Sequence, residues 1–454
     1  MRHKTLKLLL ACIVLLSGAG VANSYITSGD RFSFNGLNYE VRTMNSHYPP
    51  FYFTLISIDD SVRNAVIPDS LTVESGTYPV TEIVLDSKCD IESLTIPSTI
   101  TKIKAYEGYD DKVCFWPDSL KYVRVSSLEA WMNIVFDTSD PYDYYGPNYG
   151  ISNPLGKAST MYIGDDPVTD FVIPEGIDSV AHEAFYNAKF LKSVSFPSSM
   201  KFIGYGAFTG CDNLESIDIN SIKSWCDVDM GYFEDGYIGT SVHRYYVYMP
   251  VFSSETVLFE NGREIKSLII PESVDTIRAA VFNNCQSIKS LYIPENVKAL
   301  EAYSFEDCEG LEDIYAYSPQ PPVACSIIGY TSGVIGDWTY NYGFAFGYEK
   351  RDRPILHVPL GSSEAYRQDR YWAIFNNIVE FDPSGIEDIA DESISECFRC
   401  SNGVILFEKL PDGIVPEVYS IDGMLRHQGR SDTGVLPSGT YIIRLGRSSH
   451  KIHI

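Results

Sequence analysis

Positive charge is scarce in this sequence. Its 454 residues include 35 lysines and arginines against 60 aspartates and glutamates, and the formal net charge is −25 at pH 7. Nucleic acid and anionic lipid surfaces attract proteins through clustered positive charge. The balance therefore argues against both as partners.

Long apolar runs and catalytic motifs are also missing. Beyond the first 24 residues, no stretch reaches the roughly 18 apolar residues that cross a bilayer, so we expect no transmembrane span. The eight histidines are scattered, with no His-Glu-x-x-His, no Gly-x-Ser-x-Gly and no dinucleotide-binding fingerprint. Cys397 and Cys400 form one isolated pair, which is more typical of a local disulfide or free thiols than of zinc. We expect no enzyme activity, no cofactor and no metal site.

The first 24 residues have the pattern of a secretory signal peptide. Arg2, Lys4 and Lys7 precede an apolar run that ends in small residues, and we expect cleavage before Tyr25. Lipidation at Cys12 is the weaker alternative, because the apolar run before it is short and continues beyond it. The expected location is extracellular, at the cell surface.

What the sequence does contain is a repeat of 23 residues. Each copy starts at a proline, or once at an asparagine, that follows an apolar residue: Pro174, Pro197, Asn220, Pro271 and Pro294. Eleven and fourteen residues later come two core series, Phe185, Phe208, Phe282 and Phe305, and then Ala188, Cys211, Cys285 and Cys308. A period of this length is typical of solenoids.

A single copy of the repeat cannot fold alone. Burying its roughly six core side chains is worth about 1.5–3 kcal/mol each, whereas ordering each backbone residue costs about 1–2 kcal/mol. Stacked copies bury both faces and pair their strands. We therefore expect the four phenylalanines to form one internal file, and the cysteines of the series to be small buried side chains and not disulfides or metal ligands.

Each copy should contain one short strand that ends at its proline. Ile288, Leu291 and Ile293 lead to Pro294, which has no N–H to continue a strand ladder. The segment that follows has apolar residues three or four apart, which predicts a turn or a short helix on the opposite side of the coil.

These residues carry a resemblance to a known family. The pattern Phe-x-x-Cys-x-x-Leu-x-x-Ile, from Phe208 to Ile217, resembles the BspA-like leucine-rich repeats of surface proteins. The resemblance covers roughly residues 66–382. It implies a β-rich solenoid with short helices or turns, and a role in binding.

The remaining segments suggest a domain order. Residues 25–65 alternate as strands do, with a hairpin signal at Asn35-Gly36, and should cap the solenoid of residues 66–315. Residues 316–384, which include a Gly/Tyr-rich loop, should form the terminal coil and cap. Residues 385–396 are acidic and suit a linker.

Residues 397–454 have the pattern of a separate module of short strands. Gly439-Thr440-Tyr441 and the closing Lys451-Ile452 are similar to the C-terminal sorting domain of the type IX secretion pathway of Bacteroidota. That resemblance implies a small β-sandwich that directs passage across the outer membrane. A purely structural terminal β domain is the alternative.

Two tyrosine-rich inserts, residues 137–150 and 231–248, interrupt the repeat. Each follows a similar segment, SLEAW before the first and SIKSW before the second. Tyrosine gives large contact area at low entropic cost, and inserts in a solenoid gather on one face. Ligand contact is expected from Tyr142, Tyr144, Tyr145, Tyr149, Tyr232, Tyr237, Tyr245 and Tyr246. The alternative is that these tyrosines pack on their own coil.

The sequence thus predicts a secreted surface protein that works by binding or adhesion. Its partner would be a host or matrix protein, or another cell surface. One alternative is a glycan-binding accessory protein in which pairs of exposed tyrosines, or Trp131 and Trp225, stack on sugar rings. The other is an enzyme with a site between Val323 and Lys350.

Overall fold

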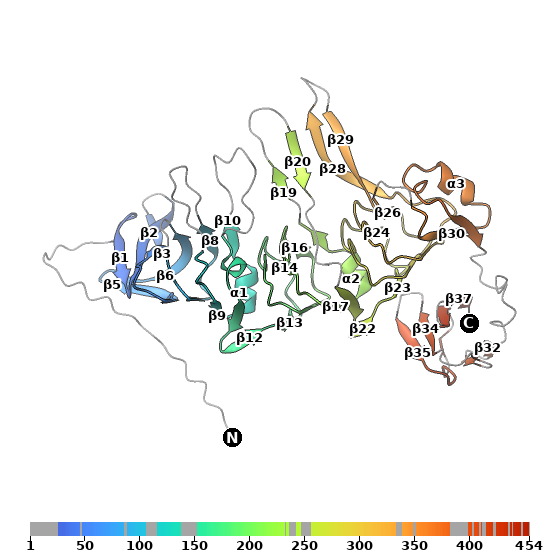
Figure 1. Cartoon of the computed structure of the whole chain (residues 1–454), viewed down its shortest axis with the longest axis horizontal. Coiled ribbons are helices and arrows are strands. Elements are labelled where there is room, and N and C mark those ends of the chain that lie inside the picture. Colours follow the sequence, from blue (N-terminus) through green and yellow to red (C-terminus); the bar gives the residue numbers. More distant parts are fainter. Residues whose placement is uncertain are drawn as a thin grey trace.

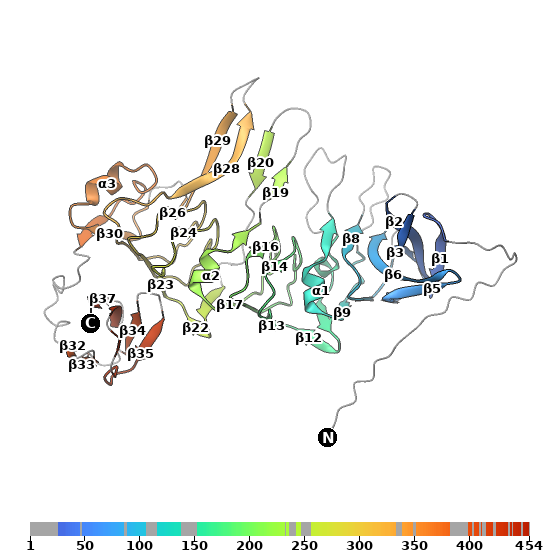
Figure 2. The same cartoon turned by 180° about the vertical axis from the view of Figure 1, so that it is seen from behind.

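The molecule is a column of stacked coils, seen from two sides in Figures 1 and 2. The computed structural model describes residues 26–45, 48–85, 89–105, 116–137, 152–231, 233–235, 242–246, 256–332, 338–347, 351–381, 398–401, 404–407, 410, 415–420, 424–434, 436–437, 439–445 and 448–453. In this part of the chain, no helix is both long and apolar enough to cross a membrane.

One side of the column, the long-strand face, carries three sheets of five strands. Their strands are parallel except in the β11–β12 and β21–β22 hairpins. In sheet order they are β12 (Asp166–Val168), β11 (Thr160–Ile163), β9 (Tyr122–Val125), β7 (Ser93–Ile96) and β4 (Asn64–Val66); β13 (Asp170–Val172), β15 (Ser193–Phe196), β17 (Ser216–Ile219), β21 (Val257–Glu260) and β22 (Arg263–Glu264); and β23 (Ser267–Ile269), β25 (Ser290–Ile293), β27 (Asp313–Ala316), β30 (Ile355–Pro359) and β31 (Ile378–Phe381).

The opposite side, the short-strand face, carries the second strand of each coil. These strands are also parallel to one another. They are β6 (Gly76–Leu85), β8 (Lys102–Ala105) and β10 (Val135–Asp137); β14 (Ser179–Val180), β16 (Phe202–Ile203) and β18 (Asp229–Met230); and β24 (Thr276–Ile277) and β26 (Ala299–Leu300).

An antiparallel meander closes the N-terminal end of the column. It consists of β1 (Arg31–Phe34), β2 (Leu37–Asn45) and β3 (Tyr48–Ile58), and β3 then pairs in parallel with β6. β5 (Ser70–Val73) pairs with β6 in the antiparallel direction. The expected turn joins β1 to β2, with positive φ at Asn35 (52°) and Gly36 (74°), as a tight two-residue hairpin requires.

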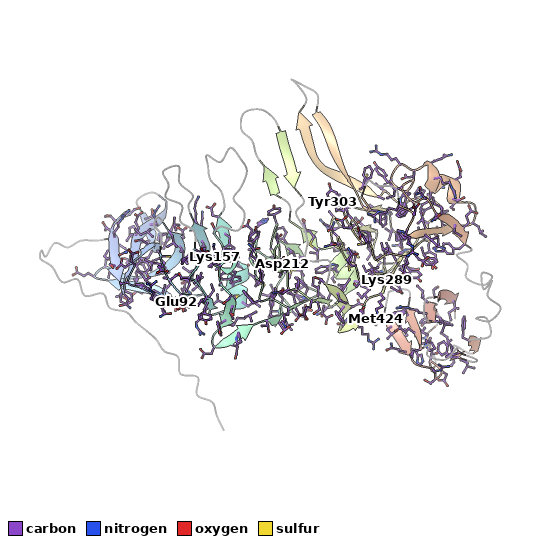
Figure 3. All side chains as sticks on the ribbon, viewed as in Figure 1. Glu92, Lys157, Asp212, Lys289, Tyr303 and Met424 are labelled. Atoms are coloured by element: carbon purple, nitrogen blue, oxygen red, sulfur yellow. The ribbon has the colours of Figure 1, made fainter. Side chains whose placement is uncertain are left out.

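Aromatic rings stack through the interior, where side chains fill the column along its length (Figure 3). Phe185 and Phe208 lie 5.2 Å apart with an angle of 12° between their planes, and Phe282 and Phe305 lie 5.4 Å apart at 11°. The stacking is interrupted between Phe208 and Phe282, so there are two files inside one continuous core. The interruption falls where a short helix, α2 (Ile222–Cys226), replaces the usual turn.

The corners between the two faces use a left-handed backbone at two fixed repeat positions. The ninth residue after each start has positive φ in four coils, and so does the thirteenth: Glu183, Gly206, Ala280 and Tyr303, and Asn187, Gly210, Asn284 and Asp307. A residue with a Cβ pays roughly 1–2 kcal/mol for this conformation. The corner amides of Glu183 and Ala280 donate to Tyr205 O and Ala302 O of the next coil, at 2.9 and 3.0 Å, which offsets that cost.

The C-terminal module has its own small core. β34 (Pro416–Ser420), β35 (Leu425–Gln428), β36 (Thr440–Leu445) and β37 (Ser448–His453) form an antiparallel sheet, and β32 (Phe398–Ser401) and β33 (Val404–Phe407) form a hairpin. The core cluster of the module consists of Ile405, Val418, Leu436, Tyr441, Ile443 and Leu445. Both sheets are open, and the β-sandwich expected from the sequence stays a prediction.

Candidate ligand-binding surface

Two short helices lie before the inserts, and each contacts a later coil. α1 (Leu128–Met132) and α2 start after Ser127 and Ser221, whose hydroxyls accept hydrogen bonds from Ala130 N and Ser224 N. These helices correspond to the SLEAW and SIKSW segments of the sequence. Each therefore begins at a serine cap and carries a tryptophan near its end.

Both tryptophans are buried. Trp131 is 1% exposed and donates its indole N–H to Ala184 O at 2.8 Å, and Trp225 is 2% exposed and donates to Val281 O at 2.7 Å. Each indole thus reaches a coil that lies 53 or 56 residues further along the chain. The hypothesis that these two rings stack on sugars is wrong, because their faces are packed inside the column.

The inserts leave the column from one edge of the short-strand face. β6, β8, β10 and β18 end at Leu85, Ala105, Asp137 and Met230. Parallel strands in register place their carboxyl ends at the same edge of a sheet, and this relation holds within β6, β8 and β10. The segments at 86–88, 106–115 and 138–151, which follow three of these strands in the sequence, lie outside the described residues.

The second insert pairs with a hairpin that lies far from it in the sequence. β19 (Phe233–Asp235), β20 (Val242–Tyr246), β28 (Cys325–Ser332) and β29 (Trp338–Phe344) form one antiparallel sheet, the projecting sheet. Its two halves meet where Val242 lies opposite Thr331 and His243 opposite Tyr330. The projecting sheet stands out from the short-strand face (Figure 1), away from the C-terminal module.

Sequence reasoning missed this sheet. The composition of the stretch with β28 and β29 predicts a Gly/Tyr-rich loop. This prediction is wrong, because the stretch is a hairpin. The alternation of small and aromatic residues in WTYNYGF is the strand signal that could have revealed it. The pairing with β20 had no local signal.

The tyrosines predicted to contact a ligand lie mostly outside the described residues. This holds for Tyr142, Tyr144, Tyr145, Tyr149, Tyr232 and Tyr237. Tyr245 and Tyr246 lie in β20, with backbone opposite Glu234 and Phe233 of β19. Ligand contact by these eight tyrosines stays a prediction.

The residues predicted to form the repeat core are all buried. They are Phe185, Phe208, Phe282, Phe305, Cys211, Cys285 and Cys308. The Cys211 thiol donates to Phe185 O at 3.1 Å, and the Cys308 thiol to Phe282 O at 3.0 Å. Burial raises the pKa of Cys211 to about 12 and that of Cys285 to about 11. These thiols are therefore protonated and unreactive at neutral pH.

One carboxyl group near the base of the projecting sheet has a shifted pKa. Burial of Glu306 is the largest cause, Asp307 adds to it and Arg351 opposes it, and the pKa rises to about 7. Within the described residues, no group of three or more histidine, cysteine or acidic side chains could hold a metal ion. A single shifted carboxyl group also occurs at purely structural sites, so it does not favour an enzyme.

The fold and the site together define a class of protein. Strand-rich coils with few helices, stacked on a continuous core, are a repeat solenoid of the leucine-rich-repeat type. More particularly, the family model described as BspA type leucine rich repeat region matches residues 159–234 and 253–320, in six copies. The gap between these segments falls at the second insert.

Solved structures with some likeness to this chain include other leucine-rich repeat proteins. A leucine-rich cell surface protein from Faecalibacterium prausnitzii is 17% identical, with 78% of this chain and 95% of that chain covered and a TM-score of 0.33. A leucine-rich repeat protein from Bacteroides ovatus is 19% identical, with 63% and 70% covered and a TM-score of 0.27. Scores this low carry no conclusion about this chain. No curated protein matches the sequence.

Proposed function

We propose that this chain is an exported surface protein whose repeat column holds its inserts towards a protein ligand, either a host or matrix protein or a protein on another cell. The observation that carries the proposal is the projecting sheet, in which two segments distant in the sequence pair and stand out from one face. A rigid column fixes several such contacts relative to one another, so weak contacts can add up.

Removing the projecting sheet should weaken binding without unfolding the column. Residues 232–255 would be replaced by a short Gly/Ser linker and residues 326–343 by a tight turn. The dissociation constant for immobilised fibronectin, laminin and collagen would be measured by surface plasmon resonance. We expect binding to at least one of these ligands by the intact chain, and a loss of at least about tenfold in the variant, because a few central contacts carry most binding energy.

A matched control changes the opposite face. Val172 and Ser195 lie on the outward side of the long-strand face, and the double change Val172→Lys, Ser195→Lys should leave the dissociation constant unchanged. Unfolding curves of both variants would show that the column is intact. Unchanged binding after loss of the projecting sheet, or binding to a glycan array alone, would contradict the proposal.

Export and sorting form a second part of the proposal. The N-terminal pattern supports cleavage before Tyr25, and the resemblance of residues 397–454 supports removal of the C-terminal module. Mass spectrometry of the mature protein from its native cell surface should find a first residue at Tyr25 and a last residue near position 385. An intact C-terminus would count against the sorting role.

A further inference from the structure

One outward row of the long-strand face is aromatic. Side chains alternate between the two sides of a strand, so every second residue faces away from the core. In β23, β25, β27 and β30 the register aligns four such residues, Ile269, Tyr292, Tyr315 and His357, which we call the aromatic row.

The rings of the aromatic row stack on each other along the sheet. Tyr292 and Tyr315 lie 4.8 Å apart with 2° between their planes, and Tyr315 and His357 lie 4.2 Å apart at 7°. His357 Nε2 lies 2.8 Å from Asp313 Oδ1. Because neighbouring rings cover each other's faces, the row presents ring edges. Aromatic side chains favour edge-to-face contacts and dominate the energetics of protein interfaces, so exposed ring edges suit a protein partner.

The equivalent row of the preceding sheet is less buried. In β13, β15, β17 and β21 the aligned outward residues are Val172, Ser195, Asp218 and Phe259. Val172 is 69% exposed and the other three residues are half-buried, whereas Ile269 and Tyr292 are each only 4% exposed. The aromatic row is therefore covered.

The cover is the C-terminal module. Ile442 of β36 is 3% exposed and forms one buried cluster with Ile269 and Tyr292. Tyr315 and Tyr317 of the column and Tyr419 of the module pack against this cluster. Tyr419 of β34 lies directly opposite Ile442 in the module's sheet. Figures 1 and 2 both show the module beside β23.

Ile442 does not belong to the module's own core cluster. Its neighbours Tyr441 and Ile443 belong to that core, and so does Val418, next to Tyr419. Ile442 and Tyr419 therefore form a pair on the opposite side of the module's sheet. The burial of Ile442 comes from its contact with the aromatic row.

We infer that the aromatic row is a protein-docking face, and that the chain's own C-terminal module, residues 398–453, is its occupant. The face is covered while the module stays in place and opens when the module leaves. The occupant's chemistry is an aliphatic side chain beside a tyrosine on adjacent strands. This interface is separate from the projecting sheet, and the contact itself does not depend on ligand binding there. Its opening rests on the removal of the module that forms part of the proposed function.

The test separates the two parts without removing either. A recognition sequence for a site-specific protease would be inserted within residues 385–396 of the full chain, and the cut protein would be run on a gel-filtration column. We expect the two fragments to elute together. After cutting, Ile442→Asp should weaken their association by at least about a hundredfold, because it buries a charge without a partner.

Two controls and a second variant complete the test. Val415→Asp adds the same charge to the module at a residue that is 52% exposed, and its fragments should still elute together. Tyr315→Ala changes the column side and should release the module even if Ile442→Asp perturbs the module's fold. The second control, Tyr162→Ala, removes a tyrosine that packs under Arg124 in a distant sheet. This change should not release the module. Separation of the unaltered fragments, or co-elution of both interface variants, would overturn the inference.

Discussion

Replacing Trp225 with alanine should lower the free energy of unfolding of the column by roughly 3–5 kcal/mol, the range for deleting a large buried aromatic side chain. The indole lies 5.0 Å from the Phe196 ring, and its N–H donates to Val281 O at 2.7 Å. Alanine would leave a cavity and a buried carbonyl oxygen without this donor. Because the bond joins coils on the two sides of the second insert, the loss should reach both.

Urea unfolding followed by circular dichroism would measure this effect, and native-state hydrogen exchange would locate it. Protection should fall in the coil that contains Phe282 as well as in the coil of Trp225. Trp225→Phe keeps a ring but loses the N–H, and should lower the free energy of unfolding less than Trp225→Ala does. Val172→Ala, at an exposed position, should cost almost nothing. A loss below about 1 kcal/mol for Trp225→Ala would mean that the indole does not join the coils.

Raising the pH from 8 to 10 should destabilise the column steeply. Burial raises the pKa of Cys211 to about 12 and of Cys285 to about 11, and it also raises the pKa of Cys226 and Cys308. An unfolded thiol has a pKa of about 8.5. The contribution of these thiols to stability is therefore complete below about pH 8.5 and is lost progressively as the pH rises from this unfolded value towards the folded values. Between the unfolded and folded pKa values, each thiol that unfolding exposes should lower the free energy of unfolding by roughly 1.4 kcal/mol per pH unit.

The matched control is the triple variant Cys211→Ala, Cys285→Ala, Cys308→Ala. Its free energy of unfolding, measured in urea with a reducing agent present, should fall much less between pH 8 and 10. Both proteins keep all their tyrosines, whose ordinary pKa is about 10, so the difference between the two pH slopes reports the thiols alone. Equal pH slopes for the two proteins would show that the thiols do not cause the effect.

The repeat itself could be predicted from the chain. Coil length, the strand before each proline and the identity of the core positions follow from the 23-residue pattern, because burial selects apolar residues at fixed spacing. The left-handed backbone at the corners could be predicted only in part from the sequence. Gly206 suggests one of them, but Ala280 and Tyr303 occupy the same repeat position, held there by backbone hydrogen bonds to Ala302 O and Phe344 O.

The sequence by itself determined that this chain stacks coils of one size around one type of core, since each coil carries its own apolar positions at a local spacing. Only the tertiary structure decided that Trp131 and Trp225 are buried, that β20 pairs with β28, and that Ile442 lies on the aromatic row. The physical reason is distance along the chain. Backbone pairing and apolar docking between remote segments use groups that every strand possesses, so the stacked coils, and not a local motif, select which segments meet.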